Sequence, residues 1–155
     1  MGNTANASDM LGITDIMEII PHRYPFLLID KARTVEADKR IIGYKSVTGN
    51  EWFFQQNFSG QPIMPGILIV EAMAQTAGIL MMNKPAMKNK LVFFLGMNGV
   101  KFRKPVSPGD QLELRVEILH YNMRGGKARG EAYVNNELTT EAELAFVVVD
   151  KQDKA

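Results

Sequence analysis

The longest apolar run in the sequence extends from Gly66 to Met82 and predicts one buried helix, because a helix that is apolar all round is surrounded by protein. Only Glu71, Gln75 and Thr76 place conventional polar side chains in this run. At the helical rise the run is about 25 Å long, which is short for a membrane span. Pro65 stands directly before it, where helices accept proline. The pattern therefore predicts a central helix inside a globular domain.

Most of the remaining chain alternates between apolar and polar residues, as half-buried strands do. The alternation is clearest in Gln111–Tyr121, and glycine and asparagine pairs mark turns further along the chain. A short helix with Thr14 as its N-cap is expected to end before Pro21. The other predicted strands are Phe26–Val35, Arg40–Val47, Leu91–Phe102 (with a bulge near Gly96 and Gly99), Ala128–Val134 and Leu138–Val149. These elements predict an α+β domain in which a sheet covers one helix.

Length and composition fit a single domain of residues 13–150 between a tail of residues 1–12 and a polar tail of residues 151–155. The net charge of +1 argues against a nucleic-acid-binding protein, which would need a strongly basic face. The chain has no cysteine and only two histidines, so we expect no metal site and no cofactor. Because no apolar signal sequence precedes the domain, we expect a cytoplasmic protein.

Glu71 and Gln75 are four residues apart, so they share one face of the predicted helix. A carboxylate inside a buried helix is costly unless it is paired or neutral. Glu71 is therefore either a group with a chemical role or a structural carboxylate that a neighbouring amide satisfies. The pattern leaves both interpretations open.

Three ordered motifs give the chain a resemblance to a known family: PHRYPFLLID (Pro21–Asp30), FFQQNFSGQPIMPGILIVEAMAQ (Phe53–Gln75) and FRKPVSPGDQLEL (Phe102–Leu114). They resemble the β-hydroxyacyl-acyl-carrier-protein dehydratases, hot-dog-fold enzymes of fatty-acid synthesis. The resemblance covers about Ile13 to Val149. It implies a hot-dog fold, in which an antiparallel sheet wraps one long central helix. It also implies a homodimer that can assemble into a trimer of dimers, with acyl carrier protein as its partner.

The resemblance implies a site with one departure from the family pattern. Family members use a loop histidine as base, a glycine amide at the helix start as carbonyl donor, and a helix carboxylic acid from the partner subunit. The last two positions are Gly66 and Glu71 in this sequence. The family loop reads Gly-His-Phe-Pro, whereas residues 56–59 read Gln-Asn-Phe-Ser, so Asn57 occupies the histidine position. An amide neither gains nor loses a proton near neutral pH.

Three functions remain open at this point. In the first, the protein is a (3R)-3-hydroxyacyl-acyl-carrier-protein dehydratase in which a water, Glu71 or His22 takes the proton. In the second, it binds acyl chains or acyl carrier protein without turning substrate over. In the third, it is a hot-dog thioesterase in which Asn57 and Glu71 position water on the carbonyl.

The resemblance also implies residues that contact substrate and carrier protein. His22 either touches the acyl chain or holds its own loop, and the apolar members of the set could equally be plain core. The expected substrate-binding residues are Gly66, His22, Phe58, Met64, Gln75 and Phe94. A basic patch for carrier-protein docking is expected from Arg23, Lys101, Arg103 and Lys104, although such a patch can also be a solvated face.

Overall fold

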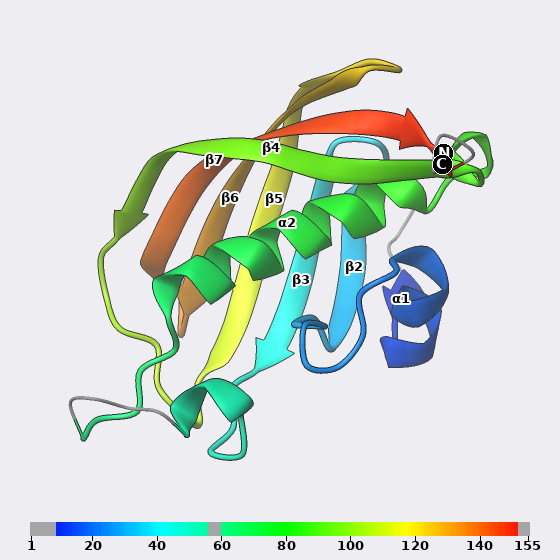
Figure 1. The fold of residues 1–155 in the computed structure, drawn as a ribbon. Coiled ribbons are helices and arrows are strands. Elements are labelled where there is room, and N and C mark those ends of the chain that lie inside the picture. Colours follow the sequence, from blue (N-terminus) through cyan, green and yellow to red (C-terminus); the bar gives the residue numbers. More distant parts are fainter. Residues whose placement is uncertain (1–8, 56–59, 152–155) are drawn as a thin grey trace.

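A computed structural model describes residues 9–55 and 60–151 of the chain. Its strands form one antiparallel sheet, and the long helix α2 crosses one face of that sheet (Figure 1). The strand order is β1-β2-β3-β5-β6-β7-β4. The elements are β1 (Met10–Leu11), α1 (Ile13–Ile19), β2 (Lys31–Glu36), β3 (Arg40–Ser46), α2 (Gly66–Met82), β4 (Lys90–Phe102), β5 (Gln111–Tyr121), β6 (Gly125–Val134) and β7 (Glu137–Asp150), with short 3₁₀ helices at Trp52–Phe54 and Pro85–Met87.

The core lies between α2 and the concave face of the sheet. On the helix, Ala72, Met73, Ala77 and Ile79 are fully buried. Alternate residues of the central strands meet them, and in β5 these are Leu112, Leu114, Val116 and Ile118. Small residues on α2 let the sheet approach the helix closely, which is how a single helix fills the interior of this domain.

The turns and bulges of the sheet follow from its glycines and asparagines. The register of β4 against β7 shifts between Phe94 and Gly96 and again between Asn98 and Lys101, as the two glycines of this strand predict. Asn135 and Asn136 connect β6 to β7 with φ angles of 49° and 64°. Asparagine tolerates this left-handed region, which a tight hairpin turn requires.

Three sequence predictions at the amino-terminal end need correction. Met10 and Leu11, assigned to the tail, pair with β2 as strand β1. The first helix begins after Gly12 rather than Thr14, and the Asp15 carboxylate accepts the Gly12 amide at 2.9 Å. The strand predicted to begin at Phe26 begins at Lys31. The backbone of residues 26–28 is bound by the Gln75 side chain of α2 instead of by a neighbouring strand.

Among the described residues, no helix is both long and apolar enough to cross a membrane.

Close packing of α2 on β3 predicts a large effect of a single methyl group at Gly43. A Cβ atom there would lie 2.4 Å from Oγ1 of Thr76, which is itself buried on the helix. Gly43→Ala should therefore lower the free energy of unfolding by about 1–3 kcal/mol, the usual cost of overpacking. Gly49→Ala is the matched control, since nothing lies within 4 Å of its added methyl group. Equal urea midpoints for the two variants would contradict the described packing.

Candidate active site

Glu71 is more exposed than the sequence predicts. Its side chain retains 41% of its accessible surface in the single chain, although most of α2 is buried. Ile67, one turn earlier on the same face, is 57% exposed. The prediction of a buried carboxylate is therefore wrong for the isolated chain, because the sheet covers α2 from one side only. The open side presents Glu71 at the surface of the helix.

Gln75 connects Glu71 to the segment that follows the PHRYP motif. Its Nε2 donates to the Glu71 carboxylate at 3.0 Å and to the Phe26 carbonyl at 2.6 Å, and its Oε1 accepts the Leu28 amide at 2.9 Å. Gln75 is 1% exposed, so these bonds are made in the interior. Such bonds are costly to lose, because a buried polar group without a partner keeps its full desolvation penalty. We therefore expect Gln75 to fix both the carboxylate and this segment.

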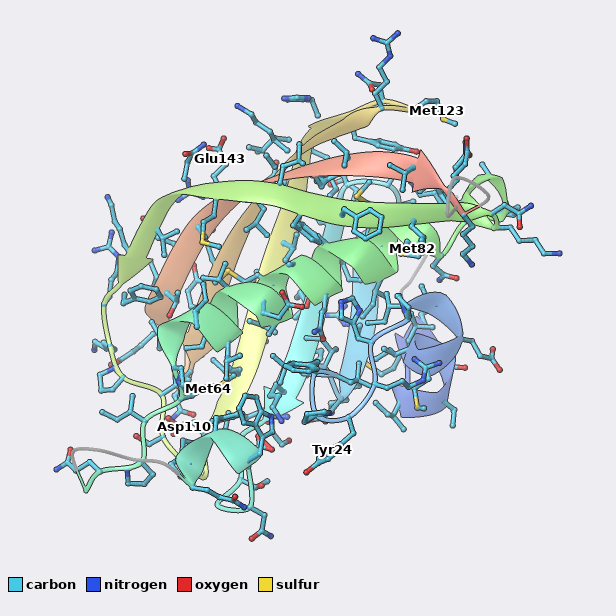
Figure 2. The ribbon with its side chains drawn as sticks, in the orientation of Figure 1. Tyr24, Met64, Met82, Asp110, Met123 and Glu143 are labelled. Atoms are coloured by element: carbon cyan, nitrogen blue, oxygen red, sulfur yellow. The ribbon has the colours of Figure 1, made fainter. Side chains whose placement is uncertain are left out.

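The other end of that segment is held by aromatic residues. Nε1 of Trp52 donates to the Pro25 carbonyl at 2.9 Å, and the Trp52 ring meets the Phe26 ring edge-on at 6.2 Å. Tyr24 points outward and is 86% exposed (Figure 2). The contacts of Trp52 and Gln75 join residues far apart in sequence. Sequence reasoning missed them, and only the hydrogen-bonding capacity of the two side chains signals them.

His22 lies next to Glu71, with 3.6 Å between Nε2 and Oε1 of the carboxylate. Its Nδ1 is buried and finds no hydrogen-bond partner within the described part of the chain. The loop is held instead by Arg23, whose guanidinium donates to the carbonyls of Ile20, His22 and Met17. The imidazole is thus placed beside the carboxylate without a side-chain hydrogen bond of its own.

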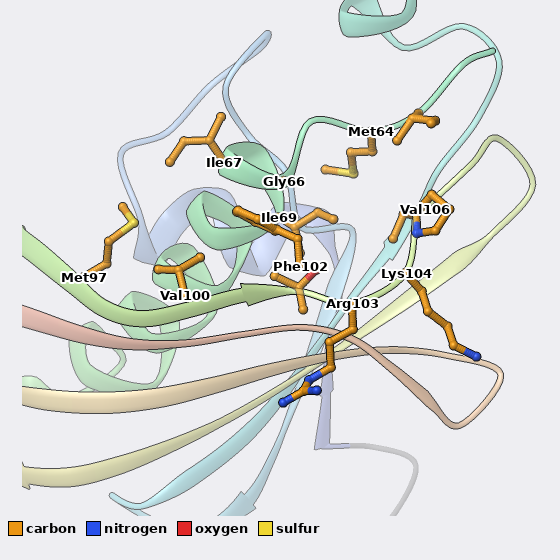
Figure 3. A pocket seen from close by; sticks show the side chains of 13 residues that line it. Met64, Gly66, Ile67, Ile69, Met97, Val100, Phe102, Arg103, Lys104 and Val106 are labelled. Atoms are coloured by element: carbon orange, nitrogen blue, oxygen red, sulfur yellow. The ribbon is translucent and has the colours of Figure 1, made fainter. Parts of the chain in front are cut away.

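Two apolar hollows flank the exposed start of α2. One, of about 460 Å³, is lined by Glu71 and by apolar residues that include Phe26 and Phe94. The other, of about 580 Å³, lies between the helix start, the end of β4 and residues 103–106 (Figure 3). Gly66 and Met64 line the second hollow, and Ile67 and Met97 line both. Of the predicted substrate-binding residues, Gly66 and Met64 therefore line one hollow and Phe94 lines the other, whereas His22 and Gln75 line neither.

Gly66 begins α2 without a side-chain cap. Amide groups in the first turn of a helix have no intrahelical partner, and they favour negative charge. A Cβ atom at Gly66 would come within 2.3 Å of the Phe102 ring, so a larger residue there would displace the ring from the helix start. The glycine and the ring together shape the hollow at the start of the helix (Figure 3).

The cations expected to dock a carrier protein are engaged within the chain. Lys101 and Arg103 approach Glu141 at 3.9 and 3.3 Å, and Lys104 pairs with Glu137. Arg23 donates to the carbonyls of Met17, Ile20 and His22, as described above. Three cations therefore face two carboxylates beside the second hollow, which leaves only a modest excess of positive charge there.

Two predicted site residues, Asn57 and Phe58, lie outside the described residues. Within the described residues no group of three or more histidine, cysteine or acidic side chains is arranged to hold a metal ion. The site that can be described therefore consists of the Glu71 carboxylate, its neighbours His22 and Gln75, and the Gly66 helix start beside two apolar hollows.

The sequence and this architecture place the chain in a defined class. A model of the FabA-like domain matches residues 20–143, and the chain therefore belongs to the FabA-like domain family. Among its curated relatives, the 3-hydroxyacyl-[acyl-carrier-protein] dehydratase FabZ of Pelotomaculum thermopropionicum is 50% identical over 139 residues, covering 90% of this chain and 99% of the relative. FabZ of Bacillus licheniformis is 48% identical over 144 residues, covering 93% and 100%. The family predicted from the three motifs is thereby confirmed.

Solved structures support the fold. The dehydratase heterocomplex ApeI:P from Xenorhabdus doucetiae superposes with a TM-score of 0.75 at 20% identity, covering 89% of this chain and 93% of that chain. Cj0977 from Campylobacter jejuni superposes with a TM-score of 0.66 at 19% identity, covering 97% and 96%. With the family match, these neighbours confirm the α+β hot-dog fold.

Proposed function

We propose that this protein is a (3R)-3-hydroxyacyl-acyl-carrier-protein dehydratase of fatty-acid synthesis, which eliminates water to give the trans-2-enoyl thioester. The observation that carries the proposal is the Glu71 carboxylate, exposed on an otherwise buried helix and opening into an apolar hollow. Relatives that are named for this activity match almost the whole chain. The apolar walls can bind an acyl chain, and the carboxyl group can donate a proton to a departing hydroxyl group.

In the proposed reaction, Glu71 protonates the departing hydroxyl group. The amide of Gly66 of the partner subunit stabilises the negative charge that develops on the thioester carbonyl, since the resemblance places the carboxylic acid and the glycine amide of one site on different subunits. Gln75 holds the Glu71 carboxylate by one oxygen, Oε1. We assign Oε2 to the substrate. His22, Phe94 and Met64 border the bound chain, and Phe58 is expected to join them from the loop that follows Trp52–Phe54.

The remaining requirement is a base for the α-proton, and Asn57 cannot supply it. Loss of a general base usually lowers a rate by about 10²- to 10⁴-fold.

The test is an assay of purified protein with 3-hydroxyacyl thioesters on acyl carrier protein, in which mass spectrometry measures enoyl thioester, free acid and unchanged substrate together. Enoyl product supports the proposal. Free acid alone would indicate a thioesterase, and bound but unchanged substrate would indicate an acyl-binding protein.

The partner in this proposal is acyl carrier protein in the cytoplasm. Its acidic surface would dock on Arg103, Lys104 and Lys101 beside the second hollow, with Arg23 on the other side of the site. Because Glu137 and Glu141 already neutralise part of this charge, we expect the docking to be weak and sensitive to salt.

We further propose a homodimer, which can assemble into a trimer of dimers. β4 ends the sheet and exposes Phe93, Leu95 and Met97, of which Leu95 is 68% exposed. An apolar edge strand of this kind favours pairing with another chain.

Light scattering should give the mass of a dimer or its multiple, and Leu95→Lys should shift it toward the monomer. Leu119→Lys, at a site 45% exposed on β5, is the control and should leave the mass unchanged. A monomeric native protein would contradict this assembly.

A further inference from the structure

The side chain of His22 is placed as a reactive group rather than as a structural one. Among the described residues, His22 forms the ion-pair contact with Glu71, and its Nε2 lies 3.6 Å from Oε1 of the carboxylate. Its Nδ1 is buried without a hydrogen-bond partner in the ranges 9–55 and 60–151, and Arg23 and Gln75 hold the surrounding backbone. A histidine that anchored the loop would use its ring nitrogens for that purpose.

The surroundings of the imidazole favour its neutral form. Burial lowers the pKa of His22 below its usual value of 6.5, and the nearby Arg23 guanidinium lowers it further, whereas the Glu71 carboxylate opposes both effects. These are the charged groups that act on His22 from α2 and from its own segment. A neutral imidazole can accept a proton, which is the property that Asn57 lacks.

We propose that His22 is the general base of this protein and forms an acid–base pair with Glu71 of the same chain. The inference rests on the dehydratase function proposed above. The separation of 3.6 Å is longer than a hydrogen bond in the unliganded protein, and catalytic contacts commonly shorten when substrate binds. The imidazole is 35% exposed, so its ring is not closed off from the open side of α2.

The proton transfers balance between this pair, the substrate and solvent. Nε2 of His22 takes the α-proton, and the electrons of the C–H bond form the α,β double bond. The bond from C3 to the hydroxyl oxygen breaks, and that oxygen takes the proton of Glu71 and leaves as water. The imidazolium then releases its proton to solvent, and Oε2 of the Glu71 carboxylate takes a proton from solvent, since both side chains are partly exposed. Both groups regain their starting states, and the products are enoyl thioester and one water molecule.

The test combines His22→Gln with Asn57→His in the full-length protein. His22→Gln should lower kcat by about 10²-fold or more, the usual range for a general base. With Asn57→His also present, the loss should be much smaller, because that substitution supplies another imidazole. The native kcat/KM should fall on the acid side as the pH passes the lowered pKa of His22, and His22→Gln should remove this acid limb. A purely structural role would produce neither the rescue nor the change in pH profile.

His120→Gln is the matched control, since His120 lies on β5 and is exposed. Its turnover should equal that of the native protein. Unchanged turnover in His22→Gln would overturn the assignment of His22 and leave the dehydratase function intact. If Asn57→His alone raises turnover, an equal loss on His22→Gln with and without it would also overturn the assignment, and so would an unchanged pH profile. If the native protein and Asn57→His both fail to dehydrate, the proposed function itself is wrong.

Discussion

Glu71→Gln is expected to lower dehydration by about 10²- to 10⁴-fold while the protein stays folded. The amide has nearly the same size as the carboxyl group and can still accept from Gln75, but it has no proton to give the leaving hydroxyl. Because the Glu71 side chain is 41% exposed, its replacement leaves no buried cavity. Steady-state kinetics should show the loss in kcat, with KM little changed, since the missing interaction belongs to the transition state.

Glu117→Gln is the control for this substitution. Its side chain is 39% exposed, close to that of Glu71, but it lies on the outer face of β5. The urea midpoints of both variants should match the native value within experimental error. Full activity in Glu71→Gln would mean that another group protonates the hydroxyl, and the proposed site would then be wrong.

Asn57→His is expected to raise kcat, by as much as about 10²-fold, because it places an imidazole at the position where the resemblance implies the family's base. The gain depends on where the loop directs the new ring, since small misplacements of a catalytic group can remove most of its effect. The same single-turnover assay should be applied to the native protein and to the variant, so that product release does not mask the chemical step.

The loop around Asn57 offers a second stage of this experiment. The resemblance implies glycine and proline where this chain has Gln56 and Ser59; glycine widens the range of backbone conformations and proline narrows it. Adding Gln56→Gly and Ser59→Pro to Asn57→His should raise turnover further. A triple variant no faster than the native protein would contradict the assignment of this loop to the active site.

The fold could be predicted in large part because its strongest signals are local. The apolar run predicts a helix at Gly66–Met82, and the structure has α2 at the same bounds. Strict alternation likewise predicts β5 at Gln111–Tyr121, where the structure places it. The topology came from the resemblance, since periodicity describes each strand but does not say which strands are neighbours.

The surroundings of Glu71 could not be predicted, because they depend on contacts between distant residues. Gln75 bonds to Leu28, which is 47 positions away in the sequence, and β2 begins only after this contact, at Lys31. The exposure of Glu71 depends on which side of α2 the sheet covers. Hydrophobicity along the helix cannot reveal that side, since nearly every residue of the run is apolar.

The candidate site was predicted only as a set of residue types. Glu71, His22 and Gln75 lie together, whereas Gly66 and Met64 border a neighbouring hollow. The contact between His22 and Glu71 is the feature that sequence reasoning missed, because a separation of 49 positions carries no periodic signal.

Oxygen exchange at C3 of the substrate tests the central claim most directly. A reversible dehydratase replaces the hydroxyl oxygen with oxygen from water each time the enoyl thioester is rehydrated. The native protein, incubated in ¹⁸O-labelled water with 3-hydroxyacyl-acyl carrier protein, should therefore introduce label into the hydroxyl group of the remaining substrate, and Glu71→Gln should not. Intact thioester that binds the protein but gains no label, or free acid whose C3 oxygen is unlabelled, would contradict the account.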